Sequence, residues 1–139
     1  VPLEYDAMQK VGHTLGSGAI LIMNDSISVR DFLHACLRFF VHESCGNCNP
    51  CRNGLKALLD IADRLRRGRG FTGDIEMMEE LCLMLKSAAF CPLGQAPAAP
   101  IMSALRYFRD EIAAGIDAAA ARPAYTRSSQ ELMPLTGMA

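Results

Sequence analysis

Four stretches of the chain repeat apolar residues every three or four positions, which is the spacing of one face of an α-helix. The pattern predicts helices over about 29–43, 51–67, 74–89 and 97–116. Ser28 is suited to cap the first helix, and Thr72 or Asp74 the third. Gly68 follows the second helix, where glycine commonly ends one. The sequence therefore predicts a mainly α fold with a helical domain over 29–121.

The residues on either side of these helices have a different pattern. Residues 1–28 contain one predicted strand, over 19–23, which is bounded by glycine and by small polar residues. A single strand cannot form a sheet, so its partner must lie in residues 2–14, in another chain or in sequence that is missing here. Residues 122–139 lose the helical period and are expected to be a flexible or partner-docking tail.

Composition excludes two classes of function. The 139 residues carry a net charge of −1, and only 6% of them are aromatic, which disfavours a nucleic-acid binder. No apolar run approaches the roughly 20 residues that a membrane-spanning helix needs. We therefore expect a cytoplasmic protein, either free or peripheral to the membrane on the cytoplasmic side. The chain begins at Val1, so it is either part of a longer polypeptide or an independent subunit.

The candidate chemistry begins in the connection between the first two predicted helices. Cys45, Cys48 and Cys51 follow a C-x2-C-x2-C spacing, with Gly46 to bend the backbone and Pro50 to stiffen it. Three thiols on one tight turn can bind three corners of a cuboidal iron–sulfur cluster. The fourth corner needs a thiol from elsewhere.

Cys91 is the predicted fourth ligand of a 4Fe-4S cluster. It precedes Pro92, just as the last cysteine of the bacterial ferredoxin motif precedes a proline. It also lies two predicted helices after Cys51. In an antiparallel four-helix bundle, the first-to-second and third-to-fourth connections lie at the same end, so the cluster is expected there.

Other interpretations of the cysteines remain open. Structural zinc usually takes two separated C-x2-C pairs, and thiols two residues apart rarely form good disulfides. Cys36 and Cys82 fall on apolar helix faces and are expected to be core residues without a metal. His42 is one turn before Cys45 and is interpreted as a rim or capping histidine, with ligation as the alternative.

Positive charge is expected around such a cluster. The second helix begins within the cysteine turn, so its N-terminus offers unpaired N–H groups to the thiolates. Arg52 and Lys56 lie at the same end and would favour the reduced cluster, although a solvated face is the alternative. A further basic group at the end of that helix is interpreted as a solvated helix terminus or a partner contact: Arg64, Arg66, Arg67 and Arg69.

Three segments together resemble a known family, namely Glu43-Ser-Cys-Gly-x-Cys-x-Pro-Cys-Arg-x-Gly54, Cys91-x-Leu-Gly-Gln95 and Leu105-Arg-Tyr-Phe-Arg-Asp-Glu111. They resemble the C-terminal part of the NADH-oxidising flavoprotein subunits. These subunits occur in respiratory complex I, in NAD(P)-linked and electron-bifurcating hydrogenases, and in NAD-dependent formate dehydrogenases. Residues 15–23 are similar to the end of the β-grasp (SLBB-type) module that precedes the cluster domain in this family.

The resemblance implies a role for the four cysteines and for partners. It implies that Cys45, Cys48, Cys51 and Cys91 hold a 4Fe-4S cluster that takes electrons from FMN. Nothing in the chain resembles the FMN and NADH site, so both molecules would bind to a missing domain or a partner chain. Other iron–sulfur subunits are the implied partners.

Two further features of the sequence refine the resemblance. Gly94-Gln95 resembles the hydrogenase and formate dehydrogenase branch, whereas Pro92 and Pro97 depart from the family pattern. The alternative function is a structural module in which iron–sulfur or zinc only ties the helices together, without redox turnover.

Overall fold

The computed structural model describes residues 2–13, 15–16, 18 and 20–120. The helices in this part of the chain are α1 (Tyr5–Lys10), α2 (Val29–Glu43), α3 (Asn49–Arg66), α4 (Asp74–Ala88), α5 (Pro92–Gln95), α6 (Ala98–Tyr107) and α7 (Arg109–Ala113). No strand forms among the described residues, where the one recorded β-bridge pairs Gly70 with Ile116. The fold is mainly α, as predicted.

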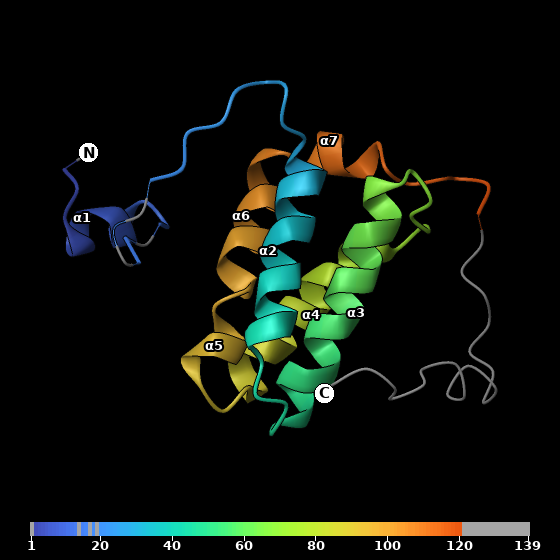
Figure 1. Ribbon diagram of the computed structural model, residues 1–139. Helices are drawn as coiled ribbons and strands as arrows, with labels where there is room; N and C mark the ends of the chain where they lie inside the picture. The colour runs from blue at the N-terminus through green and yellow to red at the C-terminus, as the bar shows by residue number, and fades with distance from the viewer. Residues whose placement is uncertain (1, 14, 17, 19, 121–139) are drawn as a thin grey trace.

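The long helices lie side by side and alternate in direction (Figure 1). The α2–α3 and α4–α5 connections meet at the lower end in this view, and we call residues 44–51 and 89–95 the thiol end. The α3–α4 connection and α7 lie at the upper end, and we call residues 28–30, 64–74 and 108–117 the polar end. The predicted cysteine ligands thus all belong to one end.

One apolar core joins α2, α3, α4 and α6. Leu58, Met78 and Leu85 are completely buried in it. The two long inner helices contribute most of its side chains, because α3 packs against both α2 and α4. None of the helices in the described part of the chain is long and apolar enough to cross a membrane.

The start of α2 is capped from two directions. Ser28 Oγ accepts a hydrogen bond from Arg30 N at 3.2 Å, which confirms the predicted cap. Glu111 Oε1 also accepts from Val29 N at 2.7 Å and from Ser28 Oγ at 3.2 Å. A carboxylate from α7 therefore satisfies an N–H that α2 itself cannot pair.

The start of α4 differs from the prediction. Gly73, at a φ of 87°, takes the cap position, and neither Thr72 nor Asp74 occupies it. Asp74 is instead the first helical residue and is completely buried. Its carboxylate accepts from Phe71 N at 2.9 Å and from Arg64 at 3.0 and 3.3 Å.

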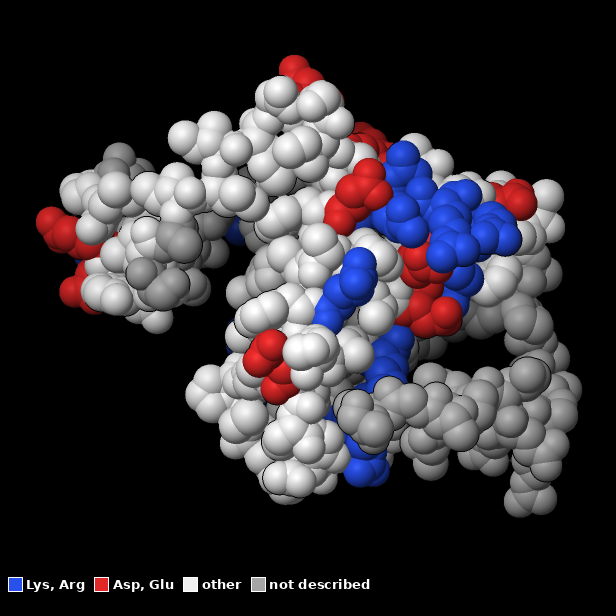
Figure 2. Space-filling view, viewed as in Figure 1, with Lys and Arg blue, Asp and Glu red and all other residues white. Residues whose placement is uncertain are grey.

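Arg64 therefore corrects part of the prediction for the basic group. Its guanidinium pairs with buried Asp74 and also lies over the Phe71 ring, so it is not a solvated side chain. Arg66 and Arg67 do stay partly exposed and share Asp63, at 3.1 and 2.9 Å. Figure 2 shows basic side chains gathered over this end of α3, with acidic side chains among them.

The predicted fourth helix is broken into three. α5 and α6 are separated near Pro97, and α6 and α7 at Phe108, where the backbone leaves the helical region at φ −131°. Phe108 was expected in the apolar stripe but is half exposed. The break allows Ile112 to enter the core and Glu111 to reach α2, which a continuous helix would not have done together.

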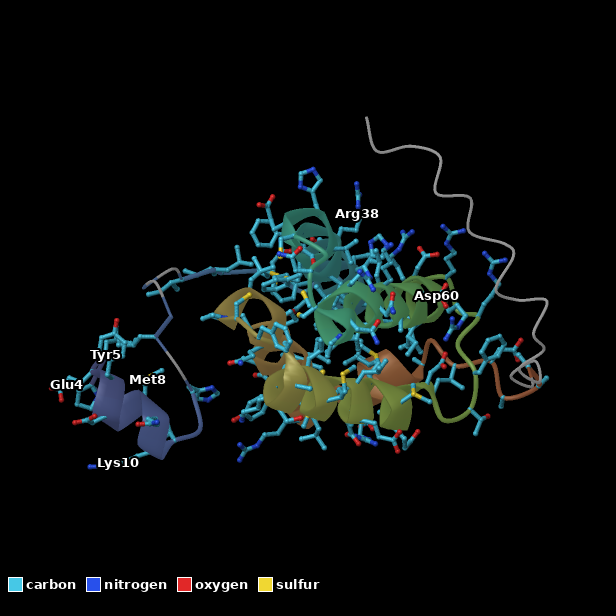
Figure 3. The ribbon with its side chains drawn as sticks, turned by 90° about the horizontal axis from the view of Figure 1, so that it is seen from below. Glu4, Tyr5, Met8, Lys10, Arg38 and Asp60 are labelled. Carbon is cyan, nitrogen blue, oxygen red and sulfur yellow. The ribbon has the colours of Figure 1, made fainter. Side chains whose placement is uncertain are left out.

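The predicted strand does not form. Residues 20–23 are irregular and have exposed side chains, and Ala19 lies outside the described residues. A strand needs a second backbone for its hydrogen bonds, and the described residues offer none. α1, which the sequence did not predict, buries no side chain, and Figure 3 shows its Tyr5, Met8 and Lys10 apart from the other helices. The predicted tail, 122–139, also lies outside the described residues.

Candidate metal centre

The cysteine turn is shaped by local contacts. α2 ends at Glu43, and Gly46 adopts a φ of 73°, which favours glycine because it has no Cβ. α3 then begins at Asn49 with Pro50 in its first turn. The Arg52 guanidinium donates to Gly46 O at 3.0 Å. Arg52 thus fixes the turn, a contact more specific than the general positive charge that the sequence suggested.

Cys48 and Cys51 are buried in this turn, at 7% and 3% exposure. The backbone N–H of Phe90 lowers the pKa of the Cys48 thiol, and the backbone N–H of Cys51 lowers it further. Phe90 directly precedes Cys91, so this contact joins the two cysteine-bearing connections. The two connections, far apart in sequence, therefore meet at the thiol end.

Gly94 allows the α5 turn to approach Cys51 closely. A Cβ added at Gly94 would lie 2.7 Å from Ala89 Cβ and 3.3 Å from Cys51 Sγ. Gln95 Nε2 also donates to Ala89 O at 2.9 Å, which ties α5 to the end of α4. These contacts hold the segment that carries Cys91, whose side chain is exposed, as is that of Cys45.

Ser44 is a residue of this site that sequence reasoning missed. Its Oγ lies 3.2 Å from Cys51 Sγ and accepts a hydrogen bond from Gly46 N at 3.3 Å. A serine two residues before a turn glycine is a typical signal for such a side-chain-to-backbone turn. That signal would have indicated the contact with Gly46, but not the contact with Cys51.

The remaining thiols and His42 lie in different surroundings. Cys82 is buried in the core, as predicted, and burial raises the pKa of its thiol to about 12. Cys36 is only half-buried, and burial raises its pKa as well. The His42 ring is exposed and lies 3.0 Å from Glu43 Oε1 through its Nδ1.

The donor set at the thiol end fits an iron–sulfur cluster. The four predicted ligands are free thiols, two of them buried at the N-terminus of α3 and near backbone N–H groups that favour thiolates. Among the described residues, no group of three or more His, Cys, Asp or Glu lies close enough to hold a single metal ion. The fold and the site define a small helical module with thiols from two connections at one end.

The comparison with protein families identifies this module. Residues 31–115 match the family described as the NADH-ubiquinone oxidoreductase-F iron-sulfur binding region. The chain belongs to this family, and its cofactor is a 4Fe-4S cluster. The resemblance in the cysteine segments is thereby confirmed.

Curated relatives agree with this assignment. In the NADH-quinone oxidoreductases, the chain is 37% identical over 117 residues to the F 2 subunit of Rhizobium meliloti and 38% identical over 117 residues to the F subunit of Escherichia coli. It is 36% identical over 114 residues to the mitochondrial NADH-ubiquinone oxidoreductase 51 kDa subunit of Neurospora crassa. These alignments cover 84%, 84% and 82% of the chain, but only 28%, 26% and 23% of the relatives. The chain thus corresponds to about a quarter of their length.

Solved structures share the fold. A NAD+-reducing [NiFe]-hydrogenase in the H2-reduced state superposes with a TM-score of 0.67 at 24% identity, over 78% of this chain and 19% of that chain. The air-oxidised state gives 0.66 at 25% identity, over 75% and 18%. The helical arrangement is therefore one already seen within a larger redox protein.

Proposed function

We propose that the chain is an electron-transfer module of an NAD(P)H-linked flavoprotein oxidoreductase complex, and that Cys45, Cys48, Cys51 and Cys91 each bind one iron of its 4Fe-4S cluster. The observation that carries the proposal is the meeting of the two cysteine-bearing connections, where the Phe90 N–H reaches the Cys48 thiol. Cys91 follows Phe90 directly, so all four thiols belong to one end of the helices (Figure 1).

The thiol end suits a charged cluster. Four thiolates give the cluster net negative charge, and the N-terminus of α3 supplies N–H groups and a positive dipole end. Arg52 adds a cation that also holds Gly46 in place. These groups favour addition of an electron, so they raise the reduction potential.

The chemistry of the cluster defines what else the complex must contain. A 4Fe-4S cluster moves single electrons, whereas a flavin can take a hydride and release its electrons one at a time. We propose that FMN and NAD(P)H bind to a flavin domain, on a longer polypeptide or on a partner subunit. Other iron–sulfur subunits would accept the electrons. Gly94-Gln95 favours a complex of the hydrogenase or formate dehydrogenase type.

The same proposal covers the organisation of the chain. α2, α3, α4 and the broken segment α5–α7 would form an antiparallel four-helix bundle over residues 29–121, with the cluster at the thiol end. Residues 1–28 would be the end of a β-grasp module, in which residues 19–23 find a partner strand outside this chain. Residues 122–139 would dock on a partner. The complex would act in the cytoplasm, free or at the membrane surface.

The test compares the isolated chain with the full assembly. The assembly should contain FMN and reduce ferricyanide with NADH, whereas the isolated chain should do neither. In the assembly, Cys91→Ser should stop electron flow to the distal acceptor. It should leave ferricyanide reduction largely intact if ferricyanide draws its electrons from the flavin. Normal distal electron flow without the cluster would contradict the relay.

Metal analysis separates the relay from a purely structural module. A relay should be brown, contain about four irons and bleach with dithionite. A colourless zinc protein, or an iron–sulfur protein that does not change redox state during turnover, would instead indicate a metal that only ties the helices together.

A further inference from the structure

We propose that the Ser44 hydroxyl donates a hydrogen bond to Cys51 Sγ and thereby raises the reduction potential of the cluster. This inference rests on the proposed function, because it requires Cys51 to be a cluster ligand. It assigns a tuning role to a side chain that is not itself a ligand. The distance that carries it is the 3.2 Å between Ser44 Oγ and Cys51 Sγ.

The direction of this hydrogen bond follows from the other partner of Ser44. A serine hydroxyl has one hydrogen to donate and two lone pairs to accept with. The Gly46 N–H already donates to Ser44 Oγ, at 3.3 Å, so the hydroxyl hydrogen remains available for a second partner. A cluster-bound Cys51 is a thiolate, which can only accept. Ser44 must therefore be the donor.

The position of Ser44 is fixed by the backbone around it. Ser44 is the C-cap residue of α2 and has left the helix, at φ −68° and ψ 124°. Two residues later, Gly46 turns at positive φ, and Arg52 holds the Gly46 carbonyl at 3.0 Å. The hydroxyl therefore needs little reorganisation to stay near the sulfur.

Burial makes this donor matter more than water at an exposed ligand. Cys51 is 3% exposed, whereas Cys45 and Cys91 are exposed and open to water. A hydrogen bond is electrostatically stronger in a less polar environment than in water. Removing the Ser44 hydroxyl would leave the buried Cys51 sulfur with weaker solvation that water could not easily replace.

The effect on potential follows from charge. Reduction transfers one electron from the reductant to the cluster, with no covalent bond formed or broken, and the sulfur ligands become more negative. Ser44 donates to one of these sulfurs, and a hydrogen bond to a more negative acceptor is stronger. The contact therefore stabilises the reduced state more than the oxidised state and raises the potential.

The experiment measures the midpoint potential in the complete complex by anaerobic dithionite titration, with the EPR signal of the reduced cluster as readout. Ser44→Ala should lower the reduction equilibrium constant by about tenfold, which is a shift of about 59 mV to more negative potential for one electron. Ser44→Thr, which keeps the hydroxyl, should restore the wild-type potential. Ser87→Ala is the matched control, because the Ser87 hydroxyl bonds only to carbonyls of α4.

A second pair of variants protects the test against loss of the cluster. Ser44→Thr and Ser44→Val have nearly the same shape and differ in the hydroxyl, so the Val variant should show the same negative shift as Ala. An unchanged potential in either hydroxyl-free variant at full iron content would overturn the inference. Loss of iron from both, with retention in the Thr variant, would also overturn it, by assigning the hydroxyl to cluster assembly.

The wild-type protein separates this inference from the proposed function. If wild type lacks the reducible cluster, the proposed function fails. If wild type carries the cluster and the Ser44 variants share its potential, only the role of Ser44 fails.

Discussion

The two ends of the helical body solve the problem of buried polar atoms in different ways. At the polar end, buried Asp74 accepts hydrogen bonds from Arg64 and Phe71, and Glu111 caps α2. At the thiol end, Cys48 and Cys51 are buried, while Cys45 and Cys91 are exposed. The polar end pairs its charges within the chain, whereas the thiol end gathers ligands for a group that the chain does not supply.

This difference implies different sources of stability. A buried carboxylate is tolerated only when it is paired and hydrogen-bonded, and Asp74 meets both conditions. The thiol end holds its second connection through a few contacts, among them that of Gln95 with Ala89 O and that of Phe90 N–H with Cys48. We therefore expect the polar end to depend on its ion pair and the thiol end to depend on its cluster.

The largest expected effect is loss of the cluster. Cys91→Ser removes the one predicted ligand that comes from the second connection, so the iron content and the visible absorption should fall sharply. Cys82→Ser is the control: it should keep the spectrum, because Cys82 is a core thiol on α4. A Cys91 variant with a normal spectrum, together with a bleached Cys82 variant, would show that the ligand assignment is wrong.

Iron removal should distinguish the two ends directly. Anaerobic chelation should increase hydrogen exchange in residues 45–51 and 90–94, because metal-binding energy is folding energy where the metal joins two segments. The amides of Val29 and Phe71 at the polar end should keep their protection, since their acceptors are Glu111 and Asp74. Equal exchange at the thiol end before and after chelation would contradict this dependence.

The polar end should respond to loss of its buried carboxylate. Asp74→Ala leaves Arg64 without its buried partner and Phe71 N without its acceptor, and should lower the free energy of unfolding by about 3 kcal/mol. Denaturant unfolding of the cluster-loaded protein measures this loss, while the spectrum should remain that of wild type. Asp60→Ala removes the exposed partner of the same arginine and should cost less than about 1 kcal/mol. Similar losses in both variants would remove the special role of burial.

The close approach at Gly94 can be tested with one methyl group. Gly94→Ala would place a Cβ against Ala89 and Cys51, which should cost about 1–3 kcal/mol and reduce iron occupancy. Gly54→Ala, within α3, is the matched control. Its new methyl meets the end of the flexible Met84 side chain, and alanine also favours a helix. Full iron occupancy in the Gly94 variant would show that the turn can move aside.

The smallest expected effect concerns the cap that α7 gives to α2. Glu111→Ala removes the acceptor of Val29 N and should lower the free energy of unfolding by about 1 kcal/mol without changing the cluster spectrum. Glu80→Ala, an exposed acidic residue of α4, should change stability by no more than about 0.5 kcal/mol. A spectral change in the Glu111 variant would mean that the two ends are coupled.

Local pattern predicted the long helices because each one carries its own information. The apolar period located α2, α3 and α4 to within about two residues, and Ser28 capped α2 as expected. The period failed after residue 97, where a single stripe over 97–116 concealed the break at Phe108. That break depends on contacts with another helix, and such contacts leave no local pattern.

The sequence by itself determined the mainly α class, the cysteine motif and, through the three matching segments, the family. These depend on helical periodicity and on residues close together in the chain. Only the tertiary structure decided that Glu111 caps α2, that Asp74 is buried against Arg64, and that Ser44 lies beside Cys51. In each case a polar atom found its partner through the packing of helices, and spacing along the chain cannot specify which side chains packing brings together.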